Sequence, residues 1–140
     1  MTPEQAFTLA NLLPVPVWAC WIFAPRSSAS RHLASALWPW AILAGMYGLF
    51  VLLAVVADAP GPGSFWSLGG VMGIFDHPWA TLAGWSHYLC LDLFAARWMV
   101  NETPEAGYRL SPVLALTLLY GPLGLLAFMA LRPLLSPRTA

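Results

Sequence analysis

Long runs of apolar residues alternate with short polar segments along the chain, which is the pattern of a polytopic membrane protein. Four runs are long enough to cross about 30 Å of hydrocarbon as helices. They cover residues 6–24, 33–57, 77–100 and 110–131. We therefore predict an all-α fold in which one domain, residues 1–140, holds four transmembrane helices.

Prolines and glycines modify this simple pattern. Pro14 and Pro16 in the first run and Pro122 in the fourth predict kinks, which membrane helices tolerate when neighbouring groups satisfy the freed carbonyls. The apolar segment Ser64–Phe75 lies between the second and third helices and is too short to cross. It is either an interfacial or re-entrant segment, or an ordinary loop lying on the helix ends.

Composition supports lipid as the main solvent of this surface. Hydrophobic residues make up 59% of the 140 residues, charged residues only 9%, and the mean hydropathy is +0.69. Soluble domains have about 25% charged residues. Net charge is zero, so no basic surface points to nucleic acid. Cys20 and Cys90 lie in apolar runs without Cys or His partners at ligand spacing, so we expect no metal site.

The arginines predict an orientation. With four crossings, four arginines fall on one side of the membrane and two on the other. The first four lie in or next to the loops after helices 1 and 3: Arg26, Arg31, Arg97 and Arg109. The other two, Arg132 and Arg138, lie in the C-terminal tail. The positive-inside rule then puts both termini on the non-cytoplasmic side. No basic region of a cleavable signal peptide precedes the first run, so that run is expected to be an uncleaved anchor.

The third predicted helix differs from the others because it contains ionisable residues at membrane depth. His87 and Asp92 are five residues apart, about 140° around a helix, so they cannot bond each other directly. Polar groups on several faces predict that this helix is the centre of the bundle. Partners for Asp92 would then come from other helices, with Asn11 and Tyr47 as the chemical candidates by depth.

These ionisable residues have two interpretations. Charged groups inside a membrane are costly and commonly functional, which makes His87, Asp92 and Arg97 candidate catalytic or ligand-polarising residues. A proton relay is one form of this interpretation, because histidine titrates near neutral pH. The alternative is a buried hydrogen-bond network that locks helix packing. Candidate ligand-binding residues line the same helix: Trp85, Tyr88, Phe94, Trp98 and Asn101.

One stretch of this helix resembles a known family. Residues 85–97 fit the pattern W-x-H-x-L-x-x-D-L-F-x-x-R, which is similar to a transmembrane helix of the plant abscisic-acid-deficient-4 family, also described as neoxanthin synthase. Further similar positions follow downstream: Asn101, Arg109, Ser111 and the Gly121-Pro122-Leu123-Gly124 stretch.

The resemblance implies a four-helix membrane protein of carotenoid metabolism. The family's plant reaction is an isomerisation in which an epoxide opens and an allene forms, and such a reaction requires an acid and a base but no redox cofactor. His87, Asp92 and Arg97 would supply acid, base and stabilising charge in interchangeable roles. No plastid-type extension precedes the first run, so we expect a bacterial cytoplasmic or intracytoplasmic membrane.

Three functions therefore remain open at the level of sequence. The first is an isomerase of an oxygenated carotenoid or similar polyene. The second is a non-catalytic carotenoid- or lipid-binding subunit of a membrane complex, and the third is a small transporter or proton-relay protein. Membrane lipid is an expected partner in each case, and a homo-oligomer or a larger complex is compatible with all three.

Overall fold

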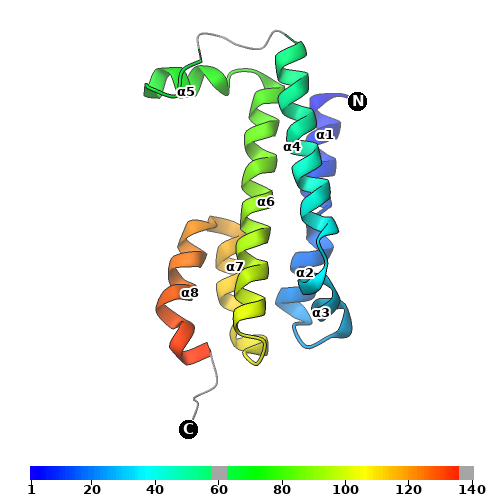
Figure 1. The fold of residues 1–140 in the computed structure, drawn as a ribbon, viewed down its shortest axis with the longest axis vertical. Coiled ribbons are helices and arrows are strands. Elements are labelled where there is room, and N and C mark those ends of the chain that lie inside the picture. Colours follow the sequence, from blue (N-terminus) through cyan, green and yellow to red (C-terminus); the bar gives the residue numbers. More distant parts are fainter. Residues whose placement is uncertain (58–62, 136–140) are drawn as a thin grey trace. The chain divides into compact units, whose positions relative to one another are not determined.

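The structure is a computed structural model that describes residues 1–57 and 63–135 (Figure 1). All regular elements in these two ranges are helices, as the sequence predicted. The chain divides into two compact units. Unit 1 comprises Met1–Leu13 and Pro39–Cys90, and unit 2 comprises Pro14–Trp38 and Leu91–Ala140. The long helix α6, Pro78–Glu102, contributes its first half to unit 1 and its second half to unit 2.

Unit 1 is built from α1 (Pro3–Leu12), α4 (Trp38–Val56, from Pro39), α5 (Leu68–Ile74) and the first half of α6. A capping box starts α1: the Gln5 N–H donates to the Thr2 hydroxyl, and the Thr2 N–H donates to the Gln5 side chain. The core of the unit brings together Phe50 of α4, Ala6 of α1, and Leu82 and Ala83 of α6. Alanines at these positions let the helix backbones approach closely.

The segment between the second and third predicted helices forms the short helix α5. Its seven residues are too few to cross a membrane. Figure 1 shows α5 to one side of the beginning of α6 and running crosswise to its direction. The Phe75 carbonyl accepts a 2.6 Å hydrogen bond from the Thr81 hydroxyl, and the Phe75 ring fills the space beside Gly84. The sequence Asp58-Ala-Pro-Gly-Pro-Gly is predicted to end the second helix, and its first five residues, 58–62, lie outside the described residues.

Unit 2 contains α2 (Val15–Phe23), α3 (Ser28–Ser35), the second half of α6, a short 3-10 helix (Gly107–Arg109), α7 (Ser111–Tyr120) and α8 (Pro122–Leu135). The first predicted helix is divided at Leu13 and Pro14, because neither Pro14 nor Pro16 can donate a backbone hydrogen bond. The Ser111 hydroxyl donates to the Ile22 carbonyl at 2.7 Å and so joins α7 to the end of α2.

The predicted start of the second helix at residue 33 is wrong. Residues 28–35 form their own helix, α3, which begins where the Ser27 hydroxyl accepts the Ser30 N–H at 3.0 Å. Ala36 is extended, and α4 begins only at Trp38. A Ser-rich segment with a side-chain cap can start a helix of its own, so it is not simply a loop.

The predicted fourth helix, residues 110–131, is also wrong as a single helix. The chain reverses at Gly121, and α7 and α8 form an antiparallel hairpin (Figure 1). The Arg109 guanidinium, before α7, donates to the carbonyls of Leu134 and Leu135 at the end of α8, at 3.0 and 3.4 Å. Gly121 permits the reversal because its φ of +30° lies in the region that glycine tolerates best.

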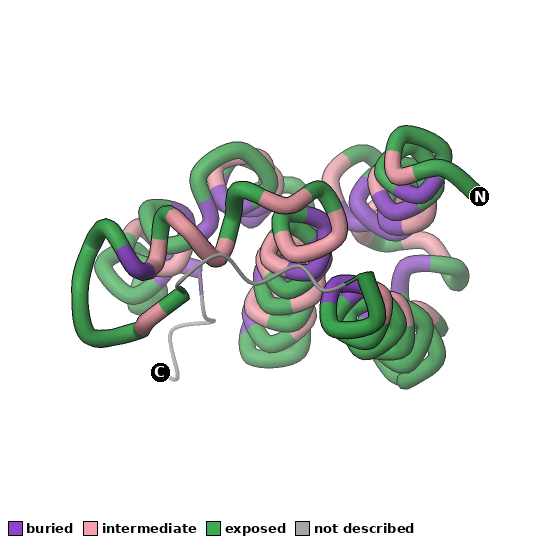
Figure 2. Tube along the Cα trace, turned by 90° about the horizontal axis from the view of Figure 1, so that it is seen from above, coloured by how far each residue is buried: buried purple, intermediate pink, exposed green. Residues whose placement is uncertain are grey.

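Two stretches of the described residues are long and apolar enough to cross a membrane by length and composition. They are Pro3–Phe23, with 21 residues, and Trp38–Val56, with 19 residues. Large apolar side chains are exposed on them, including Val55 and Val56, which are 70% and 73% exposed. Figure 2 shows that exposed residues predominate along the helices and that buried residues form patches.

The hairpin predicts a large effect of one small substitution. Gly121→Ala should destabilise the protein by about 2–4 kcal/mol, because alanine resists a positive φ and its Cβ would overlap the Asp92 carboxylate. Gly48→Ala in α4 is the matched control, since a Cβ there meets nothing within 4 Å and should change stability by about 1 kcal/mol or less. Thermal unfolding in detergent measures both, and equal stability of the two variants would contradict the hairpin.

Candidate functional site

Arg97 and Asn101 converge on one backbone oxygen of α3. The Arg97 Nε donates to the Ala34 carbonyl at 2.8 Å, and the Asn101 Nδ2 donates to the same oxygen at 3.3 Å. The two residues are four apart on α6 and therefore share a face. Ala34 lies in the last turn of α3, where carbonyls lack partners within the helix and attract positive charge. The pair therefore fastens α3 to α6.

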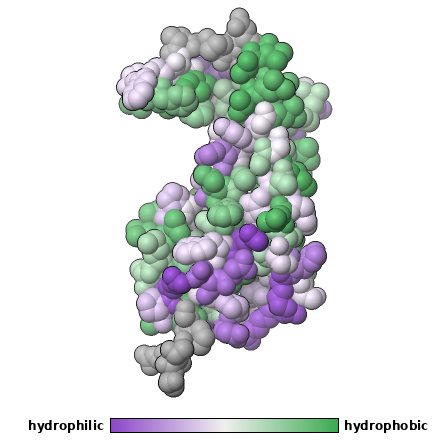
Figure 3. Space-filling view, viewed as in Figure 1, coloured by the Kyte–Doolittle hydropathy of each residue, from purple (hydrophilic) through white to green (hydrophobic). Residues whose placement is uncertain are grey.

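An open cavity of about 550 Å³ lies beside this contact. It is formed by the segment that contains α3 and by the end of α6 with the loop that follows. Its polar and charged lining residues are Arg26, Ser30, Arg31, Asn101 and Glu105, and its other lining residues are Pro25, Ala34, Val100 and Pro104. A volume of this size is typical of a small-molecule site. On the face shown in Figure 3, the most hydrophilic residues gather over this end of unit 2.

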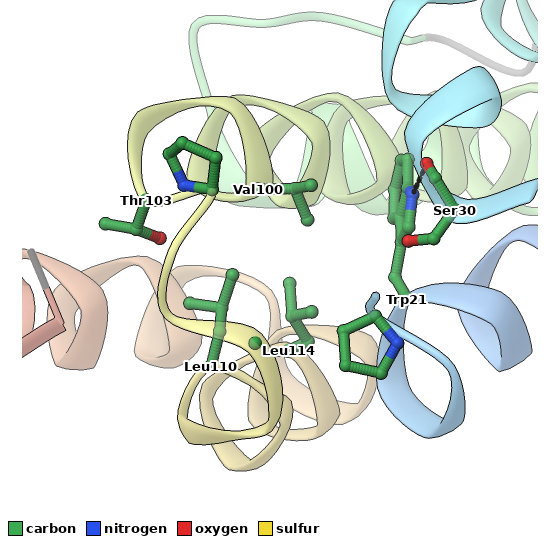
Figure 4. Close-up of a pocket in the computed structure, with 9 residues that line it drawn as sticks. Trp21, Ser30, Val100, Thr103, Leu110 and Leu114 are labelled. Carbon is green, nitrogen blue, oxygen red and sulfur yellow. Dashed lines mark hydrogen bonds between the residues drawn. The ribbon is translucent and has the colours of Figure 1, made fainter. Parts of the chain in front are cut away.

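A much smaller space of about 20 Å³ adjoins the cavity and shares several of its lining residues. Figure 4 shows Val100, Leu110 and Leu114 around this space, with Trp21 and Ser30 on its opposite side. The Trp21 indole N–H of α2 donates to the Ser30 carbonyl of α3 at 3.2 Å and so joins the two helices on that side of the space. The small space is mainly apolar and large enough for about one water molecule.

Asp92 lies at the reversal between α7 and α8. Its side chain is only 9% exposed and is packed against Gly121, so that an added Cβ on Gly121 would lie 3.0 Å from the Asp92 Cγ. Pro122, the first residue of α8, directly follows Gly121. The Asp92 carboxylate therefore lies near the N-terminus of α8, where negative charge is electrostatically favourable. Asp92 therefore stabilises the turn of the hairpin.

His87 belongs to unit 1 and lies beside the ring of Tyr47. Its ring centroid is 5.6 Å from that of Tyr47, with the planes tilted by 52°. Both side chains are exposed. Tyr47 thus packs against His87 within unit 1. The pair presents an imidazole and a phenol, which are both able to exchange protons, on one surface.

Trp85 forms the centre of an aromatic cluster in unit 1. Its ring centroid is 5.9 Å from that of Phe7 and 5.6 Å from that of Tyr88. The Trp85 indole N–H donates to the Asn11 Oδ1 at 3.1 Å and so joins α6 to α1 within unit 1. Trp85 is 38% exposed, and the cluster therefore presents ring surface to the surroundings.

The predicted site residues fall into separate groups. Trp85 and Tyr88 lie together in unit 1, and Arg97 and Asn101 lie together in unit 2. In unit 2, Trp98 packs edge-on against Phe128 at a centroid distance of 5.1 Å, and Phe94 is 54% exposed. No group of three or more potential metal-ligating side chains occurs among the described residues.

Of the residues that line the cavity, the sequence pattern indicated only Asn101 as a ligand-binding residue. Arg26 and Arg31 served only to predict the orientation. The common feature of the lining residues is position: residues 25–34 and 100–105 follow or precede apolar helices, and the fold brings these two helix ends together. A sequence pattern within one helix contains no information on this pairing.

Comparisons with known proteins match most of the chain. The sequence pattern of the ABA DEFICIENT 4-like family matches residues 5–128. The chain is 22% identical over 141 residues to the chloroplastic protein ABA DEFICIENT 4 of Arabidopsis thaliana. That alignment covers 95% of this chain and 63% of the plant protein. No solved structure matches the chain. Because the family pattern covers most of its length, the chain belongs to the ABA DEFICIENT 4-like family.

Proposed function

We propose that the chain is an integral membrane protein with three crossings and a C-terminal hairpin that enters the membrane and returns. At 1.5 Å per residue, Pro3–Phe23, α4 and α6 are about 31, 28 and 37 Å long. Each matches the hydrocarbon thickness of about 30 Å. In contrast, α7 and α8 are about 15 and 21 Å long, which is too short to cross.

The hairpin changes the expected orientation. It returns the end of α8 to the end of α6, where Arg132 pairs with Glu102. All five arginines that the structure describes then lie on one side of the membrane: Arg26, Arg31, Arg97, Arg109 and Arg132. The segments assigned to the other side, residues 1–5 and 57–77, contain no Lys or Arg. The positive-inside rule makes the arginine side cytoplasmic and places the N-terminus outside and the end of α8 inside.

The segment around α5 then lies at the outer interface. Phe65 and Trp66 are 84% and 97% exposed, and Leu68 and Met72 are also exposed. Aromatic side chains favour the boundary between headgroups and hydrocarbon. Burial of these groups in that boundary removes a large apolar surface from water.

The proposed activity is the isomerisation of an oxygenated carotenoid at unit 1. The observation that supports it is the exposed pair of His87 and Tyr47 on the unit that also carries the aromatic cluster around Trp85. The conjugated chain of the ligand would lie against the rings of the cluster, and its oxygenated end would approach the His87–Tyr47 pair. Membership of the ABA DEFICIENT 4-like family supports the choice of a carotenoid.

The reaction requires one proton donor and one proton acceptor. A proton moves to the epoxide oxygen as its C–O bond breaks, and a proton leaves the adjacent polyene carbon as the allene forms, so atoms and electrons balance. His87 and Tyr47 supply these two functions, with the imidazole as the base and the phenol as the donor. Asp92 and Arg97 act in unit 2 by holding the hairpin and α3, in place of the catalytic roles expected for them.

Site-specific labelling tests the topology. In a protein with Cys20 and Cys90 replaced by alanine, Thr2→Cys should react with a membrane-impermeant thiol reagent in intact cells, because residue 2 lies outside. Ser28→Cys and Leu134→Cys should react only after the membrane is opened. Leu134 is suited to this test because it is 66% exposed. Reaction of Leu134→Cys in intact cells would show a fourth crossing and contradict the hairpin in the membrane.

Pigment analysis tests the activity. In a bacterium that makes an epoxidised carotenoid, the wild-type protein should convert the pigment, and His87→Ala and Tyr47→Phe should each reduce conversion by about 100-fold or more, the usual contribution of acid–base catalysis. His32→Ala and Tyr120→Phe are matched controls at exposed positions outside the pair and should retain activity.

The same experiment separates catalysis from binding. Unchanged pigment with a well-folded wild-type protein would contradict the isomerase. Pigment that co-purifies without conversion, and is lost in Trp85→Leu, would support a binding subunit. Asp92→Asn should lower thermal stability, because it weakens the turn at Gly121, and a stable but inactive Asp92→Asn protein would restore Asp92 as a catalytic residue.

A further inference from the structure

The cavity of unit 2 has an excess of positive charge. Arg26 and Arg31 both line it, and Glu105 is its one lining carboxylate. The ion pair between Arg132 and Glu102 lies outside the cavity, and neither Arg26 nor Arg31 forms an ion pair with another described residue. Guanidinium groups that lack a carboxylate partner and face a common space are suited to an oxyanion.

Local contacts hold both guanidinium groups in place. The Arg31 Nη1 donates to the Arg26 carbonyl at 2.6 Å, which fixes the Arg31 side chain back along the segment between α2 and α3. The Arg26 side chain lies over Gly107, where an added Cβ would be 2.9 Å from the Arg26 Nε. Gly107 has a φ of +55°, so both the backbone conformation and the close approach favour glycine. The two cations are therefore positioned before a ligand binds.

The position and size of the cavity narrow the choice of oxyanion. Residues 24–37 connect the two stretches that are apolar enough to cross a membrane, which places Arg26 and Arg31 at the depth of lipid headgroups. Phe23 and Leu37, at the two ends of this connection, are 75% and 68% exposed. The 550 Å³ cavity is much larger than a phosphate ion and can admit the glycerol part of a lipid as well.

We infer that this cavity binds the phosphate group of an anionic phospholipid, with Arg26 and Arg31 as its charged ligands and Asn101 as a polar neighbour. The inference rests on the membrane topology proposed above but not on the carotenoid activity. Binding would join α3 and the end of α6 through the lipid, in addition to the Arg97 and Asn101 contacts with Ala34.

Native mass spectrometry of the full chain in a neutral detergent tests this inference. Phosphatidylglycerol should bind about tenfold more tightly than phosphatidylcholine or diacylglycerol of the same acyl chains. Arg26→Gln with Arg31→Gln should remove this preference. Arg132→Gln is the matched control, because it deletes one arginine at the same end of unit 2 but outside the cavity, and it should retain the preference.

Further variants and a competition experiment separate the effect of charge from that of folding, and lipid phosphate from soluble phosphate. Arg26→Lys with Arg31→Lys keeps both charges but loses the planar fork, so intermediate binding is expected. If the double Gln variant does not fold, Arg31→Gln alone decides the result. Retention of the lipid in excess inorganic phosphate would assign the site to lipid, whereas displacement would assign it to soluble phosphate and overturn the lipid proposal.

Equal binding of phosphatidylglycerol and phosphatidylcholine, or wild-type binding by a folded Gln variant, would also overturn the proposal. These outcomes are independent of pigment conversion. A protein that binds phosphatidylglycerol selectively but leaves carotenoids unchanged would refute the isomerase and keep the lipid site. A protein that converts carotenoids without lipid selectivity would do the opposite.

Discussion

The reversal of the chain at Gly121 is the constraint on which the rest of unit 2 depends. Asp92 in α6 packs against this residue, and Thr117 of α7 packs against Gly124 of α8. Each of these contacts requires that glycine, and not a larger residue, occupies the turn or the facing helix. A buried carboxylate would be costly in an apolar bundle, but here it lies beside the beginning of α8, where the helix dipole favours negative charge.

This reversal determines where the charged residues lie. A straight helix would separate Arg109 from Arg132, whereas the hairpin brings the end of α8 back to Arg109 and to Glu102. The arginine-rich end also contains α3 and the cavity. In the proposed topology the cytoplasmic end of the protein is thus the place for an anionic headgroup, and unit 1, with His87 and Tyr47, is the place for pigment chemistry.

The sequence predicted some elements closely and others not. The third predicted helix, residues 77–100, corresponds to α6, which runs two residues further, from Pro78 to Glu102. The hairpin was mistaken for a kinked helix because its apolar composition continues through the turn. Glycine followed by proline at residues 121 and 122 is nonetheless a usual way for one helix to end. The apolar segment before α6 had two interpretations at the level of sequence, and the structure shows that part of it, Leu68–Ile74, is a short helix.

The candidate site was harder to predict from the sequence. Identification of His87, Asp92 and Arg97 depended on their rarity within apolar helices, and rarity does not reveal which partner each side chain meets. Within unit 1, Tyr47 packs against His87 and Asn11 accepts a hydrogen bond from Trp85, and neither contact is indicated by a pattern in the sequence. The cavity depends on two segments about 70 residues apart, which only the tertiary fold brings together.

The distance between spin labels at Tyr108 and Leu134 tests the central claim most directly. Both side chains are exposed, at 58% and 66%, and they bracket α7 and α8. The hairpin predicts a short distance, below about 20 Å, because two packed helices lie about 10 Å apart. A continuous helix would instead separate the two positions by about 39 Å. A distribution centred near that longer distance in lipid nanodiscs would contradict the reversal at Gly121 and the orientation derived from it.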